Sequence, residues 1–226
     1  MTSPPRTIAL VGIDGSGKTT QAHRLADEIG ATYRRNAGGR RWFGRLAARL
    51  GRGDDAEDLL GRRRMLFVES VLRWLAILRT LLRRAVTGEV AVMDRYAFCQ
   101  YASLRARGGS DRRARLAYRI FPAPDVTFFL AVDPRTAHDR VEARGYDHES
   151  VEYLTAADAA YRSLPEFSTF VVIDANATPD EVAAAVRARL PQPVAASSRV
   201  RALVLAGASL AAAGVGVLGY QLAETF

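Results

Sequence analysis

Short apolar runs alternate with longer stretches of helical periodicity along most of the chain. Strand-like runs occupy Thr7–Val11, Val90–Met93, Val126–Val132 and Thr169–Ile173, with Ala31–Arg34 as a weaker candidate. Such runs, separated by helix-length segments, are typical of right-handed βαβ crossovers, in which helices cover both faces of a parallel sheet. The pattern therefore predicts an α/β fold with a five-stranded parallel sheet, and ligands are expected at the carboxyl ends of its strands.

A long apolar pattern with helical spacing runs from Met65 to Leu82. Three charges interrupt it, at Glu69, Arg73 and Arg79. Charges at these positions would be costly in lipid, so the stretch is interpreted as a core helix or a dimer interface rather than a membrane span.

The C-terminal part of the chain has a different composition. A helical pattern from Pro179 to Leu190 closes a domain of residues 1–190, and residues 191–201 are linker-like. Residues 202–223 carry no charge and are long enough, as a helix, to span a bilayer. Arginines precede this stretch and only Glu224 follows, which predicts a single C-terminal anchor with the remainder on the cytoplasmic side. A tail helix that docks in a groove of a protein would have a similar sequence pattern.

A glycine-rich turn follows the first apolar run and opens onto the helical stretch Thr20–Glu28. Its spacing fits GxxxxGK[ST], in which backbone N–H groups cradle a polyphosphate at the positive end of a helix. Lys18 is expected to neutralise the β and γ phosphates, and Thr19 to hold Mg²⁺. The residues expected to contact the nucleotide are Gly12, Ile13, Asp14, Gly15, Ser16, Gly17, Lys18, Thr19 and Thr20.

Composition strengthens this interpretation. Lys18 is the one lysine among 32 Lys plus Arg residues, so an ammonium stands where a planar guanidinium would fit poorly between two phosphates.

A net charge of +8 suits nucleic acid, anionic lipid or a polyphosphate alike, but no nucleic-acid-binding motif accompanies it, so specific nucleic-acid binding is not expected. The single cysteine, Cys99, and a start without an apolar signal favour a reducing, cytoplasmic setting.

A basic amphipathic pattern runs from Arg40 to Leu50, with Trp42, Phe43 and Leu46 at helical spacing. A helix of this kind can lie on an anionic membrane. It can equally be a surface helix near a phosphate site, and the sequence leaves both interpretations open.

Charged residues follow two of the predicted strands. Asp94 and Arg95 stand where a strand would end at the ligand crevice: Asp94 is a candidate to organise Mg²⁺ through water, and Arg95 to grip an acceptor phosphate, although a structural ion pair is the alternative. Arg140 and Arg144 lie on a helix after Val126–Val132, just before Gly145, which starts a polar segment able to close over a nucleotide. These arginines are candidates to meet charge developing on the transferred phosphoryl group.

Over about residues 6 to 190 the chain resembles the thymidylate kinase family of P-loop nucleoside monophosphate kinases. The shared features are the GIDGSGKTT loop, MLF at 65–67, DRY at 94–96, and FLAVDP followed by Arg140 and Arg144. The resemblance implies a P-loop NTPase fold, transfer of the ATP γ-phosphoryl group to a dTMP-like nucleoside monophosphate, and a requirement for Mg²⁺. A homodimer is also expected, with the apolar stretch from Met65 to Leu82 as a candidate interface.

The resemblance also implies roles for individual residues. Asp14 occupies a position near the acceptor's sugar and phosphate, Arg95 one that binds the acceptor phosphate, and Phe67 one that stacks on the base. Arg34 or Arg35 supplies a further phosphate contact. Because Gly15 replaces the catalytic arginine that some members carry in the loop, that charge is expected from Arg140 or Arg144.

The base site departs from the family pattern. Val71 stands where the family has an arginine, and Ser103-Leu104 where it has a tyrosine-glutamine pair. The polar segment from Gly145 also lacks an arginine. These departures leave a second hypothesis open, a nucleotide-binding interaction protein with weak or no kinase activity.

Overall fold

The computed structural model describes residues 6–36, 49, 61–145 and 149–191. Its centre is a five-stranded parallel sheet in the order β2-β3-β1-β4-β5. The strands are β1 (Thr7–Val11), β2 (Thr32–Arg35), β3 (Ala91–Asp94), β4 (Val126–Ala131) and β5 (Val171–Asp174). The predicted α/β class and five-stranded parallel sheet are confirmed, and the weak second candidate is a real edge strand.

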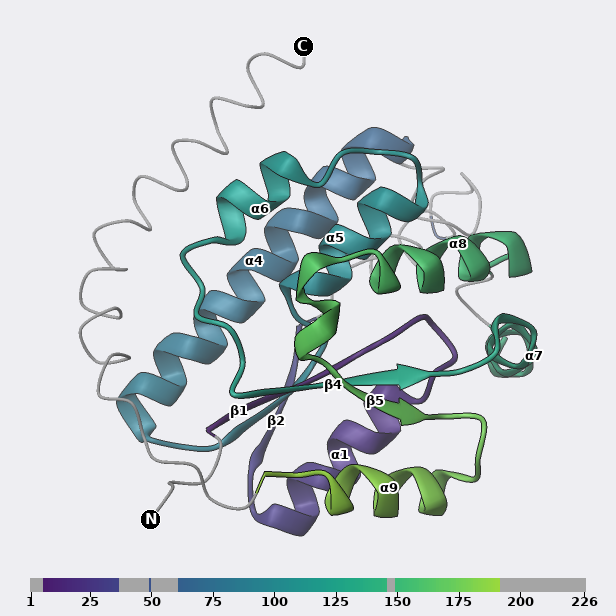
Figure 1. The fold of residues 1–226 in the computed structure, drawn as a ribbon. Helices are drawn as coiled ribbons and strands as arrows, with labels where there is room; N and C mark the ends of the chain where they lie inside the picture. Colours follow the sequence, from purple (N-terminus) through teal and green to yellow (C-terminus); the bar gives the residue numbers. More distant parts are fainter. Residues whose placement is uncertain (1–5, 37–48, 50–60, 146–148, 192–226) are drawn as a thin grey trace.

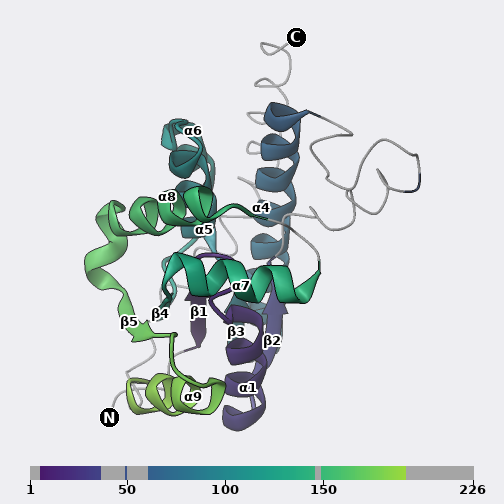
Figure 2. The same cartoon turned by 90° about the vertical axis from the view of Figure 1, so that its right-hand side faces the viewer.

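Helices cover both faces of the sheet (Figures 1 and 2). On one face α1 packs against α9, and on the other α5 packs against α4 and α8. Helix α7 lies beyond the carboxyl ends of the strands. The helices are α1 (Lys18–Ile29), α4 (Arg62–Thr87), α5 (Ala97–Ala106), α6 (Arg112–Tyr118), α7 (Pro134–Arg144), α8 (Val151–Arg162), the 3-10 turn η1 (Pro165–Thr169) and α9 (Pro179–Ala188).

The central strand explains why the first apolar run is continuous. All five residues of β1 are buried, because helices cover both faces and β3 and β4 cover both edges. Phe129 on β4 continues this core and packs its ring on Tyr161 of α8 and Phe167 of η1. The chain connections reverse direction on either side of β1, so its carboxyl end is the point where an open α/β sheet forms its ligand crevice.

The starts of α7 and α9 are fixed by local sequence. Asp133 caps α7 by accepting hydrogen bonds from the backbone N–H groups of Arg135 and Thr136. Thr178 and Glu181 form a reciprocal capping box at α9, where Pro179 occupies the first turn. Caps of this kind contribute about 1 kcal/mol each and set where a helix begins, so they fix the starts of α7 and α9 shortly after β4 and β5 end.

Several predicted segments lie wholly or almost wholly outside the described residues: the amphipathic stretch Arg40 to Leu50, the linker 191–201 and the apolar stretch 202–223. Across the described ranges, none of the helices combines the length and the apolar character needed to cross a membrane. The pattern from Met65 to Leu82 lies within α4, whose charges include the buried Glu69 and Arg73. The homodimer and the C-terminal anchor stay predictions.

Candidate active site

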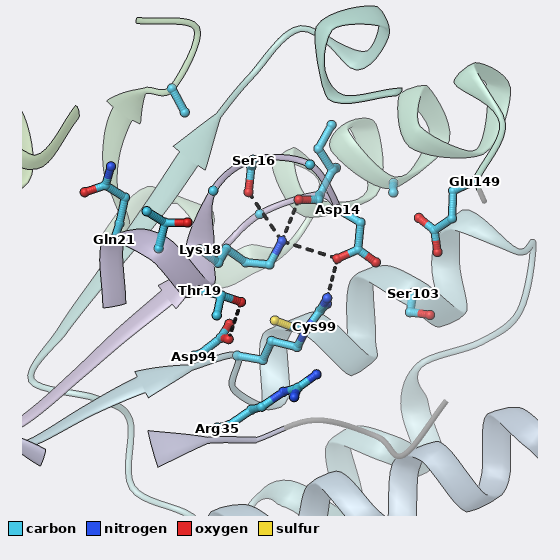
Figure 3. A pocket seen from close by; sticks show the side chains of 18 of the residues that line it. Asp14, Ser16, Lys18, Thr19, Gln21, Arg35, Asp94, Cys99, Ser103 and Glu149 are labelled. Atoms are coloured by element: carbon cyan, nitrogen blue, oxygen red, sulfur yellow. Dashed lines mark hydrogen bonds and ion pairs between the residues drawn. The ribbon is translucent and has the colours of Figure 1, made fainter. Parts of the chain in front are cut away.

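A cavity of about 1010 Å³ opens at the carboxyl ends of the strands, around the glycine-rich loop (Figure 3). Its lining includes every predicted nucleotide-contact residue from Gly12 to Thr20, together with Arg35, Asp94, Arg95, Arg140 and Arg144. Phe67 is the exception among the predicted site residues. It is half-buried on α4 and does not belong to the described residues that line this cavity.

The loop between β1 and α1 has a backbone that only glycine accommodates at two points. Gly12 has a φ of 144°, and a Cβ atom there would lie 2.8 Å from the carbonyl oxygen of Leu130. Gly15 has a φ of 82°, and a Cβ atom there would collide with the carbonyl group of Ala137 on α7. The loop is therefore packed against β4 and α7, with its N–H groups at the N-terminus of α1.

Lys18 is buried at the centre of this loop, with only 5% of its surface exposed. Its ammonium donates to the carbonyl oxygen of Ile13 at 2.5 Å and to Ser16 Oγ at 3.3 Å, and lies 3.5 Å from Asp14 Oδ1 (Figure 3). Burial, followed by the charge of Arg95, lowers its pKa from the usual lysine value. A cation held in this way is positioned to exchange its loop contacts for phosphate oxygens.

Asp14 and Arg95 form an ion pair across the cavity, joining the loop after β1 to the turn after β3. Arg95 has a φ of 78°, in the left-handed region that a bulky side chain seldom adopts. Burial disfavours the charged form of Asp14, but Arg95 and Lys18 outweigh this and hold its pKa well below the usual value. The carboxylate therefore stays ionised at neutral pH and keeps the two cations in place.

The carboxylate of Asp94 accepts two hydroxyl donors on one oxygen. Thr19 Oγ1 lies 2.7 Å and the Tyr33 hydroxyl 3.0 Å from Asp94 Oδ2. The other oxygen, Oδ1, is buried and has no hydrogen-bond partner within the described part of the chain. Burial and the adjacent carboxylate raise the pKa of Tyr33, so its phenol keeps its proton and donates.

Of the remaining predicted arginines, three line the cavity and one, Arg34, does not. Arg34 is engaged with Glu89 away from the cavity, whereas the neighbouring Arg35 lines it. Arg140 lines the cavity but donates to the backbone carbonyl oxygens of Ala175 at 2.9 Å and Asn176 at 3.4 Å. Arg144, one turn further along α7, also lines the cavity, and its charge contributes to lowering the pKa of Asp14.

A buried polar cluster on α4 and α5 was not predicted from the sequence. Arg73 donates to Gln100 Oε1 at 2.6 Å and to Glu69 Oε1 at 3.1 Å. Glu69 Oε2, Arg73 Nε and Gln100 Nε2 are all buried and have no hydrogen-bond partner among the described residues. The available signal was the i,i+4 spacing of Glu69 and Arg73 inside an apolar stretch, which places opposite charges on one face of a helix.

Another polar group lines the cavity around Ser103, a position that the family resemblance placed in the base site. Arg107 donates to Ser103 Oγ at 2.6 Å and to the Tyr153 hydroxyl, and its guanidinium lies 4.3 Å from the centre of the Tyr153 ring. All three residues line the cavity. Ser103 lies in α5, Arg107 directly after it, and Tyr153 in α8. The packing of α5 against α8 is not predicted by any local sequence motif.

Comparisons with known proteins agree with this arrangement. A family model described as thymidylate kinase matches residues 10–186. The chain is 32% identical to a probable thymidylate kinase of Archaeoglobus fulgidus, covering 80% of this chain and 92% of that protein. It is 33% identical to a thymidylate kinase of Dinoroseobacter shibae, covering 84% and 98%. It is also similar in fold to a deoxyadenosine kinase from M. mycoides solved with dCMP and dCDP, with a TM-score of 0.61, 16% identity, and coverage of 81% and 97%.

Proposed function

Because this chain belongs to the thymidylate kinase family, we propose that it transfers the γ-phosphoryl group of ATP to dTMP, giving dTDP and ADP. The observation that carries the proposal is the position of the phosphate loop within the cavity. The lining extends from the loop toward β5 and α9 on one side and toward α4 and α5 on the other. This leaves room for a donor nucleotide and an acceptor that meet at Lys18.

The donor is assigned to the side of β5 and α9. There the lining includes Ala175, Ala177, Pro179 and Val182, small or apolar side chains that suit a purine ring. Gln21 ties α1 to this region by donating to the carbonyl oxygen of Pro179 at 2.8 Å. The triphosphate then lies along the loop, where N–H groups, the helix dipole and Lys18 offset its charge.

The residues around Asp94 fit Mg²⁺. Asp94 Oδ1 is a buried oxygen that finds no partner in the described part of the chain, and the hydroxyl of Thr19 is adjacent. Mg²⁺ prefers hard oxygen ligands, keeps several waters and needs few protein ligands, so Thr19 and Asp94 would hold it directly or through water. When bound with ATP it would neutralise charge on the β and γ phosphates.

The acceptor phosphate is assigned to Arg95 and Arg35. Both arginines line the cavity. Arg95 forms an ion pair with Asp14 of the phosphate loop, and Arg35 is exposed at the end of β2. A guanidinium presents several donors to phosphate oxygens, and two guanidinium groups offset repulsion between the acceptor phosphate and ATP. Asp14 orients Arg95 and is placed to accept from an acceptor hydroxyl.

The acceptor base is assigned to Glu69 and Arg73, which line the cavity, while Gln100 lies outside the lining and accepts from Arg73. Glu69 Oε2 is an unpaired acceptor and Arg73 Nε an unpaired donor among the described residues. Thymine presents a complementary pair on its pairing edge, because its N3–H group donates and O2 or O4 accepts. Cytosine has no N–H group at N3, so its ring nitrogen would face the Glu69 carboxylate without a proton to donate. These two contacts therefore favour thymine over cytosine.

Arg144 is assigned to the transferred phosphoryl group. Arg140 is engaged with the carbonyl groups after β5, which suits a role in holding the donor side in shape. Arg144 lines the cavity and acts electrostatically on Asp14. The chain's contribution to the reaction is then to align the acceptor oxygen with the γ phosphorus and to offset charge on the equatorial oxygens, without a covalent intermediate.

An acceptor panel tests this proposal. ADP release from Mg²⁺-ATP is measured with dTMP, dUMP, dCMP, dAMP and dGMP. The highest kcat/KM is expected with dTMP, and lower values with dCMP and dAMP, whose ring nitrogen at the pairing edge carries no proton for Glu69. Tight ATP binding without turnover of any acceptor would instead favour the nucleotide-binding interaction protein.

The C-terminal anchor is proposed separately from the chemistry. Residues 202–223 are uncharged and follow Arg187, Arg189, Arg199 and Arg201. The full-length protein should sediment with membranes and require detergent for release, whereas a version ending at Ser198 should stay in the supernatant. Full-length protein in the supernatant without detergent would contradict the anchor and leave the kinase assignment untouched.

A further inference from the structure

The carboxylate of Asp94 is held in an asymmetric way. Its Oδ2 atom accepts from Thr19 at 2.7 Å and from the Tyr33 hydroxyl at 3.0 Å, while Oδ1 accepts from no group that the structure describes. The residue is only 2% exposed. Two donors on one oxygen fix the rotation of the carboxylate, so one defined oxygen is left for another ligand.

The two donors come from different parts of the fold. Thr19 lies in the first turn of α1, next to the phosphate loop. Tyr33 lies on the edge strand β2, whose parallel register with β3 pairs it with Val92, two residues before Asp94. Thr19 is itself a candidate metal ligand, so its contact with Asp94 is open to change when a nucleotide arrives. Tyr33 is a donor without any such second role.

The ring of Tyr33 is also held by a stacking contact. The imidazole of His23, one turn further along α1, stacks on it with ring centres 3.6 Å apart and an interplanar angle of 22°. A stacked ring has little freedom to swing, so the hydroxyl is presented to Asp94 in one position. Sequence gave no indication of this contact, because the pairing of His23 with Tyr33 depends on how α1 crosses β2.

We propose that Tyr33 is a positioning residue for the divalent metal of the Mg²⁺-ATP complex. Its hydroxyl holds Asp94 Oδ2, so that Oδ1 faces the metal or a metal-bound water, and the His23 stack keeps the phenol in place. Outer partners of this kind orient a metal ligand without touching the metal, and their removal commonly costs 10- to 100-fold in metal affinity or activity. The inference rests on the Mg²⁺-ATP-dependent transfer proposed above.

The test uses Tyr33→Phe, which removes the hydroxyl and keeps the ring. ATP affinity is measured by calorimetry for the full chain in Mg²⁺ and in EDTA, and the ratio of the two dissociation constants is compared with the unsubstituted protein. The variant should bind metal-free ATP as tightly as the unsubstituted protein does. The factor by which Mg²⁺ tightens ATP binding should be roughly tenfold smaller in the variant. The free Mg²⁺ concentration for half-maximal turnover should rise by a similar factor, with the KM for dTMP unchanged.

Two further variants separate positioning from packing. Tyr118→Phe is the matched control, because it deletes a buried hydroxyl that donates to the carbonyl oxygen of Ser70 at 2.6 Å, on α4 and far from the loop in sequence. Its Mg²⁺ ratio should equal that of the unsubstituted chain. His23→Ala should lower the ratio less than Tyr33→Phe, and His23→Phe, which restores a stacking ring, should recover it.

The outcomes are distinct. Equal losses in Mg²⁺ and in EDTA would mean that Tyr33 only supports packing, and an unchanged ratio would mean that it does not act on Asp94; either result overturns the inference. Failure of the unsubstituted protein to bind Mg²⁺-ATP at all would overturn the proposed function instead.

Discussion

In the proposed function, the two ends of the cavity recognise phosphate and base in physically different ways. At the phosphate end, one contiguous segment from Gly12 to Thr19 supplies the backbone, the cation and the hydroxyl. At the proposed base end, Glu69 and Arg73 line the cavity, and Arg73 meets Gln100 only because α4 packs against α5. A site made of backbone and one local motif tolerates little change, whereas a site made of side chains on two helices can change its ligand by substitution. This difference accounts for a conventional loop beside an unusual base site.

The largest expected effect lies at the phosphate end. Lys18→Ala removes the one buried ammonium of the loop, and kcat should fall by about 10³-fold or more because charge on the transferred group is no longer offset. The preference among acceptor bases should not change. Lys18→Arg should not restore activity, since a planar fork does not fit where a compact ammonium lay. Full activity of Lys18→Ala in a protein with an unaltered circular dichroism spectrum would contradict the assignment.

Substitution of the two arginines of α7 should affect different kinetic parameters. Arg144→Ala should lower kcat about 10²- to 10³-fold with little change in either KM, as expected for an interaction made mainly in the transition state. Arg140→Ala should chiefly raise the KM for ATP, because its contacts shape the turn after β5. Steady-state kinetics of both variants decide this, and the reverse pattern would exchange their roles.

At the base end, Glu69→Gln should lower kcat/KM for dTMP about 10- to 100-fold and leave the KM for ATP unchanged. The substitution keeps an oxygen for Arg73 but replaces the carboxylate oxygen assigned to the N3–H group of thymine. Glu89→Gln is the matched control, because Glu89 also forms a partly buried pair with an arginine, Arg34, but outside the cavity lining. An equal loss in both variants would point to stability rather than recognition.

The smallest expected effect concerns stability at alkaline pH, through a tyrosine that contacts α4. Burial raises the pKa of Tyr118, whose hydroxyl donates to Ser70 on α4, from 10.0 to about 12 despite the opposing charge of Arg73. The folded protein then holds this proton more tightly than the unfolded chain does. Its contribution to the free energy of unfolding is complete below about pH 10 and is lost as the pH rises toward 12, by an amount on the order of 2 to 3 kcal/mol.

Denaturant titrations between pH 9 and 12 test this contribution. The free energy of unfolding should fall with pH, and Tyr118→Phe should flatten the slope. An identical slope in the variant would show that Tyr118 does not carry the effect. Activity at the phosphate end, measured at neutral pH, should be unchanged by Tyr118→Phe.

The parts of the molecule that could be predicted from sequence are those encoded by neighbouring residues. The run Thr7–Val11 is the strand β1 as predicted, and the loop after it lines the cavity throughout. Strand ends elsewhere shift by one or two residues, as with Val171–Asp174 for the predicted Thr169–Ile173. Helix α4 extends beyond the predicted stretch at both ends, since its arginine-rich turns carry no apolar pattern to mark them.

The base end and the metal-side contacts could not be predicted in the same way. Glu69 and Arg73 appeared as charges that interrupt an apolar helix, and their third partner, Gln100, lies 27 residues further on. Tyr33 reaches Asp94 only because β2 pairs with β3, a contact 61 residues apart in sequence. The resemblance assigned the base to Phe67, which does not belong to the described lining, and that role stays a prediction. Tertiary packing, rather than any local pattern, decides each of these positions.

The most direct test of the central claim follows the phosphoryl group itself. The protein is incubated with γ-labelled ATP, Mg²⁺ and dTMP, and the labelled product is separated and identified. The account predicts label in the β phosphate of dTDP for the unsubstituted chain, none above background for Lys18→Ala, and reduced transfer with retained ATP binding for Glu69→Gln. Label that appears only as inorganic phosphate, or no transfer by a protein that binds Mg²⁺-ATP tightly, would contradict it.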